Sequence, residues 1–141
     1  MDREKIANLY NKYGLAKEDV FKHQNYLIIT RTGIEKIQAF EKINVSYEVV
    51  ECQPKFACVK AIAHIEKHKW IETFGSALKG DGFRDGNCIT WYVMEMAEKR
   101  ALSRAVLKVT GFYELGVFGE DESEEFKRSS VKSKKQKKWE V

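Results

Sequence analysis

Hydrophobic residues recur with helical spacing twice in the first third of the chain. In residues 2–13 they stand at positions i, i+3, i+4 and i+7, which predicts a helix that ends at Gly14. Residues 34–43 repeat the pattern and predict a second helix, closed by Asn44. Between them, residues 26–30 (Tyr-Leu-Ile-Ile-Thr) form a β-branched run that predicts a short strand.

The pattern changes to strands in the middle of the chain. Residues 46–52, 56–65 and 69–78 predict three strands, separated by a turn at Pro54 and a polar turn at 66–68. Short links between consecutive strands imply an antiparallel meander. In the polar loop that follows, at 79–87, the glycines have the spacing of neither a Walker A loop nor a dinucleotide-binding fingerprint.

The longest predicted element is a helix over residues 89–110, which contains no glycine or proline and stops at Gly111. Ala97, Ala101 and Ala105 recur every four residues, so one stripe of this helix is small and can pack closely. The fold class predicted from these elements is α+β. An antiparallel β-β-β-α core has the long C-terminal helix packed across its sheet, and a strand and helices are added at the N-terminus.

Charge divides the chain into two parts. A length of 141 residues fits one domain, which we expect to span residues 1–118. Residues 119–141 hold an acidic block followed by a Lys/Ser-rich run, and they predict a disordered tail that folding does not need. Residues 1–111 contain 18 Lys and Arg against 14 Asp and Glu, a basic excess that permits nucleic-acid binding without requiring it.

Several classes of protein are disfavoured. There is no signal peptide and no apolar run long enough to span a membrane, so we expect a cytoplasmic protein without a membrane partner. The three cysteines are an odd number, which favours reduced, buried thiols. Cys52, Cys58, His64 and His68 lack the spacing of a zinc finger, so no metal or other cofactor is expected.

The long helix carries the most informative charges. Arg100, Arg104 and Lys108 are four residues apart and stack on one helix face, with Lys99 one step round. Such a ladder can follow a nucleic-acid backbone, because guanidinium groups bind phosphates in a bidentate manner. The alternative is a solvated helix face whose arginines form structural salt bridges.

The order of elements, with two motifs, resembles the single-strand annealing proteins of the Rad-fifty-two superfamily, in their phage and bacterial form. The motifs are residues 29–33 (Ile-Thr-Arg-Thr-Gly) and residues 95–105, which contain Lys-Arg-Ala-Leu. The resemblance covers about residues 25–111. It implies that Lys99, Arg100 and Arg104 contact phosphates, although Ser103 stands where a further basic residue is expected.

The resemblance also implies an activity and partners. The expected function is ATP-independent binding and annealing of single-stranded DNA in homologous recombination and repair, by protomers that join into a ring or filament. A host or phage single-strand binding protein or exonuclease is a further expected partner. Arg31, Lys55 and Lys60 are candidates to extend the basic groove, as are Lys67, Lys69 and Arg84. Lys60 stands out because a lysine among apolar strand residues needs solvent or an anion.

Other interpretations remain open. The aromatic residues can stack on bases or fill the core, and we expect most of them to be core: Tyr47, Trp70, Phe74, Trp91 and Tyr92. A long helix beside an antiparallel sheet is also the outline of a hot-dog thioesterase, for which Glu95 and Glu98 are candidate catalytic acids. A third interpretation is a non-enzymatic adaptor that binds a partner through the tail. We expect no enzymatic activity.

Overall fold

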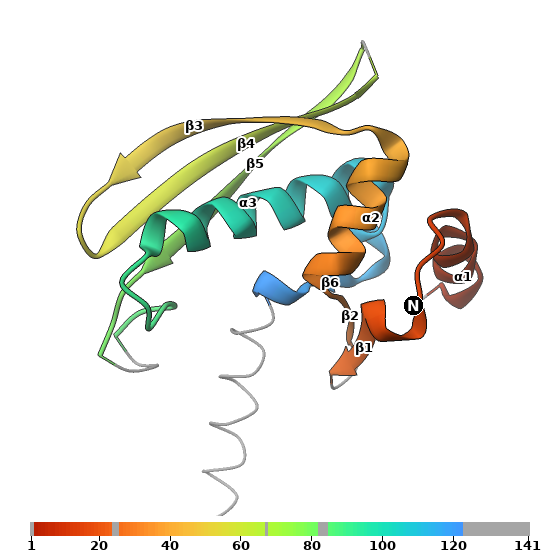
Figure 1. Ribbon diagram of the computed structural model, residues 1–141, viewed down its shortest axis with the longest axis horizontal. Coiled ribbons are helices and arrows are strands. Elements are labelled where there is room, and N and C mark those ends of the chain that lie inside the picture. Colours follow the sequence, from red (N-terminus) through yellow and green to blue (C-terminus); the bar gives the residue numbers. More distant parts are fainter. Residues whose placement is uncertain (1, 24–25, 67, 82–84, 123–141) are drawn as a thin grey trace, which may run out of the picture.

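The computed structural model describes residues 2–23, 26–66, 68–81 and 85–122 (Figure 1). Within these ranges the helices and strands divide into a long three-stranded sheet with its covering helix and a smaller part built from both ends of the chain. In chain order the elements are α1 (Arg3–Lys12), η1 (Lys17–Asp19), β1 (Val20–His23), β2 (Tyr26–Ile29), α2 (Arg31–Glu41), β3 (Asn44–Cys52), β4 (Phe56–Glu66), β5 (Lys69–Leu78), α3 (Val93–Thr110), η2 (Tyr113–Leu115), β6 (Val117–Gly119) and η3 (Glu120–Glu122).

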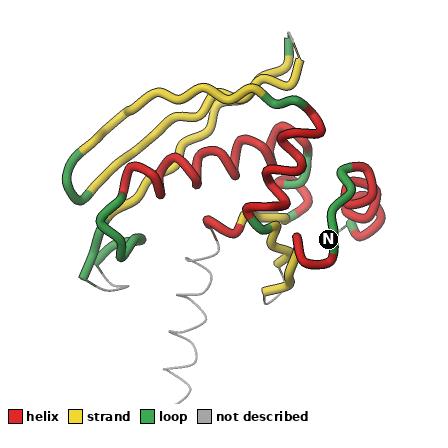
Figure 2. The backbone as a smooth tube through the Cα atoms, viewed as in Figure 1, coloured by secondary structure: helices red, strands yellow, loops and turns green. Residues whose placement is uncertain are grey.

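The β-β-β-α core predicted from the sequence is confirmed. Strands β3, β4 and β5 pair antiparallel in sequence order, and α3 crosses one face of their curved sheet (Figure 2). Ala97, Ala101 and Ala105 are fully buried against that face, as the stripe of small residues predicts. At Gly75 of β5 the strand comes so close that an added Cβ would overlap backbone atoms of Ala97 and Ala101.

A second sheet was only partly predicted. It has the order β1-β2-β6, with β1 antiparallel and β6 parallel to β2. The expected strand at 26–30 is β2, whereas the sequence pattern predicts neither β1 nor β6. Since β6 is three residues long and pairs with a segment about ninety residues earlier, no local pattern marks it.

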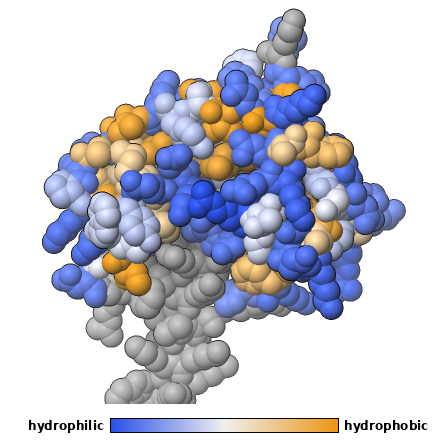
Figure 3. Space-filling view, in the orientation of Figure 1, coloured by the Kyte–Doolittle hydropathy of each residue, from blue (hydrophilic) through white to orange (hydrophobic). Residues whose placement is uncertain are grey.

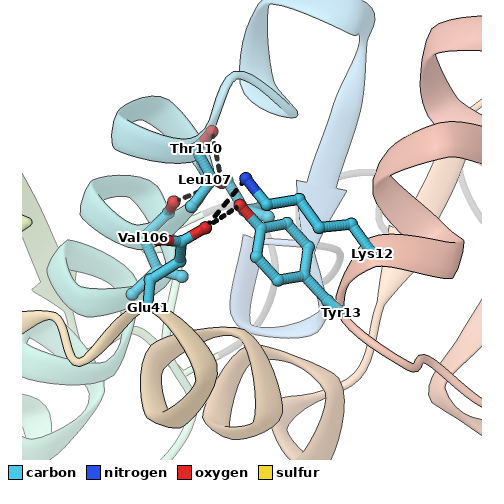
Figure 4. Close-up of polar contacts among 6 residues, drawn as sticks. All are labelled: Lys12, Tyr13, Glu41, Val106, Leu107 and Thr110. Atoms are coloured by element: carbon cyan, nitrogen blue, oxygen red, sulfur yellow. Dashed lines mark hydrogen bonds and ion pairs between the residues drawn. The ribbon is translucent and has the colours of Figure 1, made fainter.

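Helix α1 is held to α2 by a polar contact beside the core (Figure 4). The hydroxyl of Tyr13 donates a hydrogen bond to Oε1 of Glu41 at 2.9 Å, and Nζ of Lys12 lies 3.0 Å from the same oxygen. Burial, followed by the bond to Glu41, raises the pKa of the Tyr13 hydroxyl above its usual value. The Tyr13 ring packs against Phe112, which joins the N-terminal helix to the segment after α3.

None of the helices in the described part of the chain has the length and apolar character needed to span a bilayer.

The folded part continues beyond the boundary expected at residue 118. Gly119 is buried against Ser103 of α3, and the Oγ of Ser103 donates to Oδ2 of Asp121 at 3.0 Å. Oε2 of Glu120 accepts the backbone N–H of Arg31, at the start of α2. Four residues expected in the tail, 119–122, therefore belong to described secondary structure, and residues 123–141 lie outside the described part of the chain.

This boundary makes a truncation experiment specific. A chain ending at Glu122 is expected to keep the wild-type melting temperature. A chain ending at Phe118 loses the contacts of Gly119 and Asp121 and is expected to be less stable by roughly 1–3 kcal/mol, because buried partners on α3 are left unbonded. Thermal unfolding of both chains checks this, and equal melting temperatures would show that η3 adds nothing to stability.

Candidate nucleic-acid interface

The basic ladder predicted on the long helix is only partly exposed to solvent. Arg100 is only 5% exposed, and its guanidinium is hydrogen-bonded to three backbone carbonyls. Nη1 donates to Ser76 O at 2.7 Å, Nη2 to Asn87 O at 2.7 Å and Nε to Asp121 O at 3.3 Å. The expectation that Arg100 contacts phosphates is therefore not supported by its position, which is that of a structural link between β5, the loop before α3 and η3.

Arg104 and Lys108 lie on the same side of α3, next to the outer edge of β5. Nη1 of Arg104 donates to the backbone carbonyl of Phe74 at 3.1 Å. Lys108 is exposed, and its Nζ lies 5.1 Å from the ring centroid of Tyr113. The four-residue spacing thus places Arg104 and Lys108 side by side, as a ladder requires. The backbone that they lie along is β5 of this chain.

Lys99 and Arg31 point elsewhere. Five residues separate Lys99 from Arg104, a rotation of about 140° around the helix axis, so the two cannot share a face. Lys99 is half-buried. Arg31 is exposed at the start of α2, where its Nε lies 3.5 Å from Oε1 of Glu35. The structure does not bring these two residues to the edge of β5.

Lys60 and Lys55 belong to the three-stranded sheet. Lys60 lies on the face opposite α3, with its Nζ 3.0 Å from Oε2 of Glu48 and 3.8 Å from Oε1 of Glu72. The hydrogen bond to Glu48 raises the pKa of Lys60. The anion that its apolar neighbours require is thus supplied from within the sheet. Lys55 is exposed in the turn between β3 and β4, at the end of the sheet far from Trp70.

The prediction that most aromatic residues are core is wrong. All five are exposed: Tyr47, Trp70, Phe74, Trp91 and Tyr92. Trp70 and Phe74 matter most, because both lie on the open face of β5 and are 58% and 50% exposed. The ring of Trp70 stacks on that of His64 in β4, with centroids 6.2 Å apart and planes 28° apart.

These contacts define one surface that combines aromatic rings and cations, which we call the β5-edge strip: Lys69, Trp70, Phe74, Arg104 and Lys108. Phe74 is adjacent to Arg104 through its carbonyl, and Trp70 lines an open pocket of about 320 Å³ together with Lys69 and Lys108. Trp70 and Phe74 are four positions apart along β5, a distance of roughly 13 Å. The strip therefore presents two rings and three cations along one sheet edge.

Two acidic residues lie close to the strip. Glu72 stands between Trp70 and Phe74 on the same face, but Lys60 partly neutralises it. Glu114 lines the pocket opposite Lys69. Lys69 lies outside both sequence motifs, at the start of β5. The sequence signal that marks the open face of β5 is the alternation of its residues.

The geometry of the described residues supports neither a metal site nor a thioesterase site. Cys52 pairs with buried Ala57, whereas Cys58 pairs with Ser76 on the opposite face of the sheet, so these two thiols diverge. Cys52 is also exposed rather than buried as expected. Among the described residues, no group of three or more His, Cys, Asp or Glu could hold a metal ion. Glu95 and Glu98 are exposed, whereas a hot-dog thioesterase needs its acid buried in an interface.

Comparison of the chain with protein-family models, with curated proteins and with solved structures gives no match.

Proposed function

We propose that this protein binds single-stranded DNA along the β5-edge strip and promotes annealing without ATP. The observation that supports the proposal best is the side-by-side arrangement of exposed Trp70 and Phe74 with Lys108 and Arg104. Proteins that bind single strands combine stacking rings with cations that follow the phosphates, and each stacked base contributes about 1–3 kcal/mol.

The chemistry of annealing fits a surface of this kind. A strand has to be held by its phosphates and by stacking while its base-pairing edges remain free to test a complementary strand. A surface along a sheet edge binds the DNA strand from one side only, so the opposite side of that DNA strand stays accessible. ATP is not required, because pairing itself supplies the free energy.

Broader parts of the proposal come from the resemblance. We infer a role in homologous recombination and repair in the cytoplasm, with several protomers acting on one strand. Residues 127–138 contain seven Lys and Arg and would add a sequence-independent contact with long strands. A single-strand binding protein or an exonuclease is the proposed protein partner.

Salt dependence of binding tests the position of the site. Removing one phosphate contact is expected to reduce the slope of log affinity against log salt by about 0.7 for a single strand. Lys108→Ala and Lys69→Ala are each expected to weaken binding of oligothymidine and to lower the slope by that amount, measured by fluorescence anisotropy.

Lys55→Ala is the matched control, since it removes an exposed lysine at the far end of the same sheet. Its affinity and slope are expected to equal those of the wild type. Equal losses at Lys55 and Lys108 would contradict a localised strip and would favour diffuse attraction by the net charge of +4.

A further inference from the structure

The two edges of the β3-β4-β5 sheet differ in whether another strand can join them. On the second half of the β5 edge, three backbone groups that point away from β4 are bonded by side chains of α3 and of the loop before it. Phe74 O accepts from Arg104, Ser76 O from Arg100, and Leu78 N donates to Oδ1 of Asn87. The β3 edge carries no such cover among the described residues, and every residue of β3 except half-buried Val45 is exposed. The β3 edge is therefore more open to pairing than the β5 edge, which is covered from Phe74 onward.

The register fixes which groups of β3 are available. Hydrogen-bonding groups alternate from side to side along an antiparallel strand. The backbone carbonyl of Phe74 is directed away from β4, so the backbone groups of its register partner Lys60 are directed away from β5 and toward β3. Lys60 is paired there with Glu48. Glu48 therefore faces β4, and the residues one position away, Tyr47 and Val49, turn their N–H and C=O groups outward. Val45 does the same two positions earlier.

We propose that a second copy of this chain pairs its β3 antiparallel with this edge, about a twofold axis at Tyr47. The three outward residues are symmetric about that position, so Val45 lies opposite Val49 of the second copy and Tyr47 opposite its equivalent. Each of these pairs exchanges two backbone hydrogen bonds, six in all. A strand paired in this way satisfies groups that a long exposed edge otherwise leaves to water.

Side chains at the edge are compatible with the same axis. In this register Ser46 lies opposite Glu48 of the second copy, and the two Glu48 side chains are diagonal neighbours across the axis, each with Nζ of its own Lys60 at 3.0 Å. Val49 is 62% exposed, and Figure 3 shows hydrophobic surface along the top of the molecule, where Figure 1 places the sheet. The bulge between Val49 and Glu51 ends the pairing.

The twofold contact predicts a dimer, whereas the resemblance implies a ring or filament. The dimer contact does not depend on DNA binding. A twofold contact closes on itself and gives a dimer. Extension of the sheet from copy to copy, β3 to β5, would have to break the side-chain bonds to Phe74, Ser76 and Leu78. Five residues a side is far below the roughly 20–30 residues of a standard interface, so we expect a weak dimer.

Residue-resolved amide hydrogen exchange on the full chain, at concentrations a hundredfold apart, tests the proposal without any substitution. The amides of Val45, Tyr47 and Val49 are expected to exchange slowly only at high concentration, where sedimentation shows a dimer. The amides of Ser46 and Glu48, bonded to β4, are expected to be protected at both concentrations. Outward amides that exchange equally fast at both concentrations would overturn it.

Two variants separate this dimer from other assemblies. Tyr47→Lys puts two cations face to face at the axis and is expected to weaken dimerisation at least tenfold. Ser46→Lys puts a cation opposite Glu48 of the second copy and is expected to dimerise as well as the wild type or better. A Tyr47→Lys chain that dimerises like the wild type would refute the interface, as would a ring whose protected amides lie outside β3. Oligothymidine binding by monomeric Tyr47→Lys reports separately on the β5-edge strip.

Discussion

Replacing Gly75 with alanine is expected to destabilise this protein more than any other single methyl addition in the sheet. A Cβ at this position would overlap the carbonyl oxygen of Ala97 and the amide nitrogen of Ala101. Both obstacles are backbone, so no side chain can turn aside and α3 has to move off β5. Overpacking costs about 1–3 kcal/mol in ordinary cores, and we expect at least the upper end of that range here. Thermal unfolding measures the loss.

A second glycine supplies the control for this variant. Gly111 has a φ of +91° at the end of α3, and a Cβ there meets no atom within 4 Å. Gly111→Ala is therefore expected to cost only the conformational penalty, about 1–2 kcal/mol. A Gly75→Ala protein as stable as Gly111→Ala would show that α3 does not pack on β5 at the distance described.

Arg100→Ala is expected to lower stability by about 3 kcal/mol, because it leaves three half-buried carbonyls without their charged donor. The same change in a phosphate-binding residue on the surface would leave the melting temperature unaltered and weaken DNA binding. Arg100→Lys is expected to restore little, since a single ammonium cannot reach Ser76, Asn87 and Asp121 as the planar guanidinium does.

Lys99→Ala is the matched control for Arg100, one residue away on the same helix. Lys99 is half-buried, so its loss is expected to change the unfolding free energy by less than about 0.5 kcal/mol. If the Arg100→Ala protein melts like the wild type and binds oligothymidine more weakly, the interpretation from the resemblance is correct and the structural role assigned to Arg100 is wrong.

The core of the fold could be predicted because its signals are local. Three alternating runs and one uninterrupted helix lie next to one another in the chain, and the alanine stripe marks the side of α3 that packs. The environment of Arg100 has no such signal. Its acceptors come from β5, from the loop before α3 and from η3, and only the folded chain brings these three segments together.

The candidate site could have been predicted in part from the alternation of β5. Ile71, Thr73, Gly75 and Ala77 form one face and are small enough to pack on the alanine stripe. The other face holds Trp70, Glu72 and Phe74, and a glutamate between two aromatic residues indicates a face in contact with water. That signal outweighs the general tendency of large aromatic side chains to be buried. How α3 aligns Lys108 with Trp70 depends on tertiary packing, which the sequence pattern does not encode.

The central claim, that the rings and cations of the β5-edge strip hold single strands for annealing, is tested most directly by an annealing assay. Complementary labelled oligonucleotides are mixed without ATP, with wild type, with a Trp70→Ala and Phe74→Ala double variant, or with Trp91→Ala, which removes an even more exposed ring elsewhere. The account predicts that wild type and Trp91→Ala accelerate pairing, whereas the folded double variant does not. Equal acceleration by the double variant, or none by the folded wild type at low salt, would contradict it.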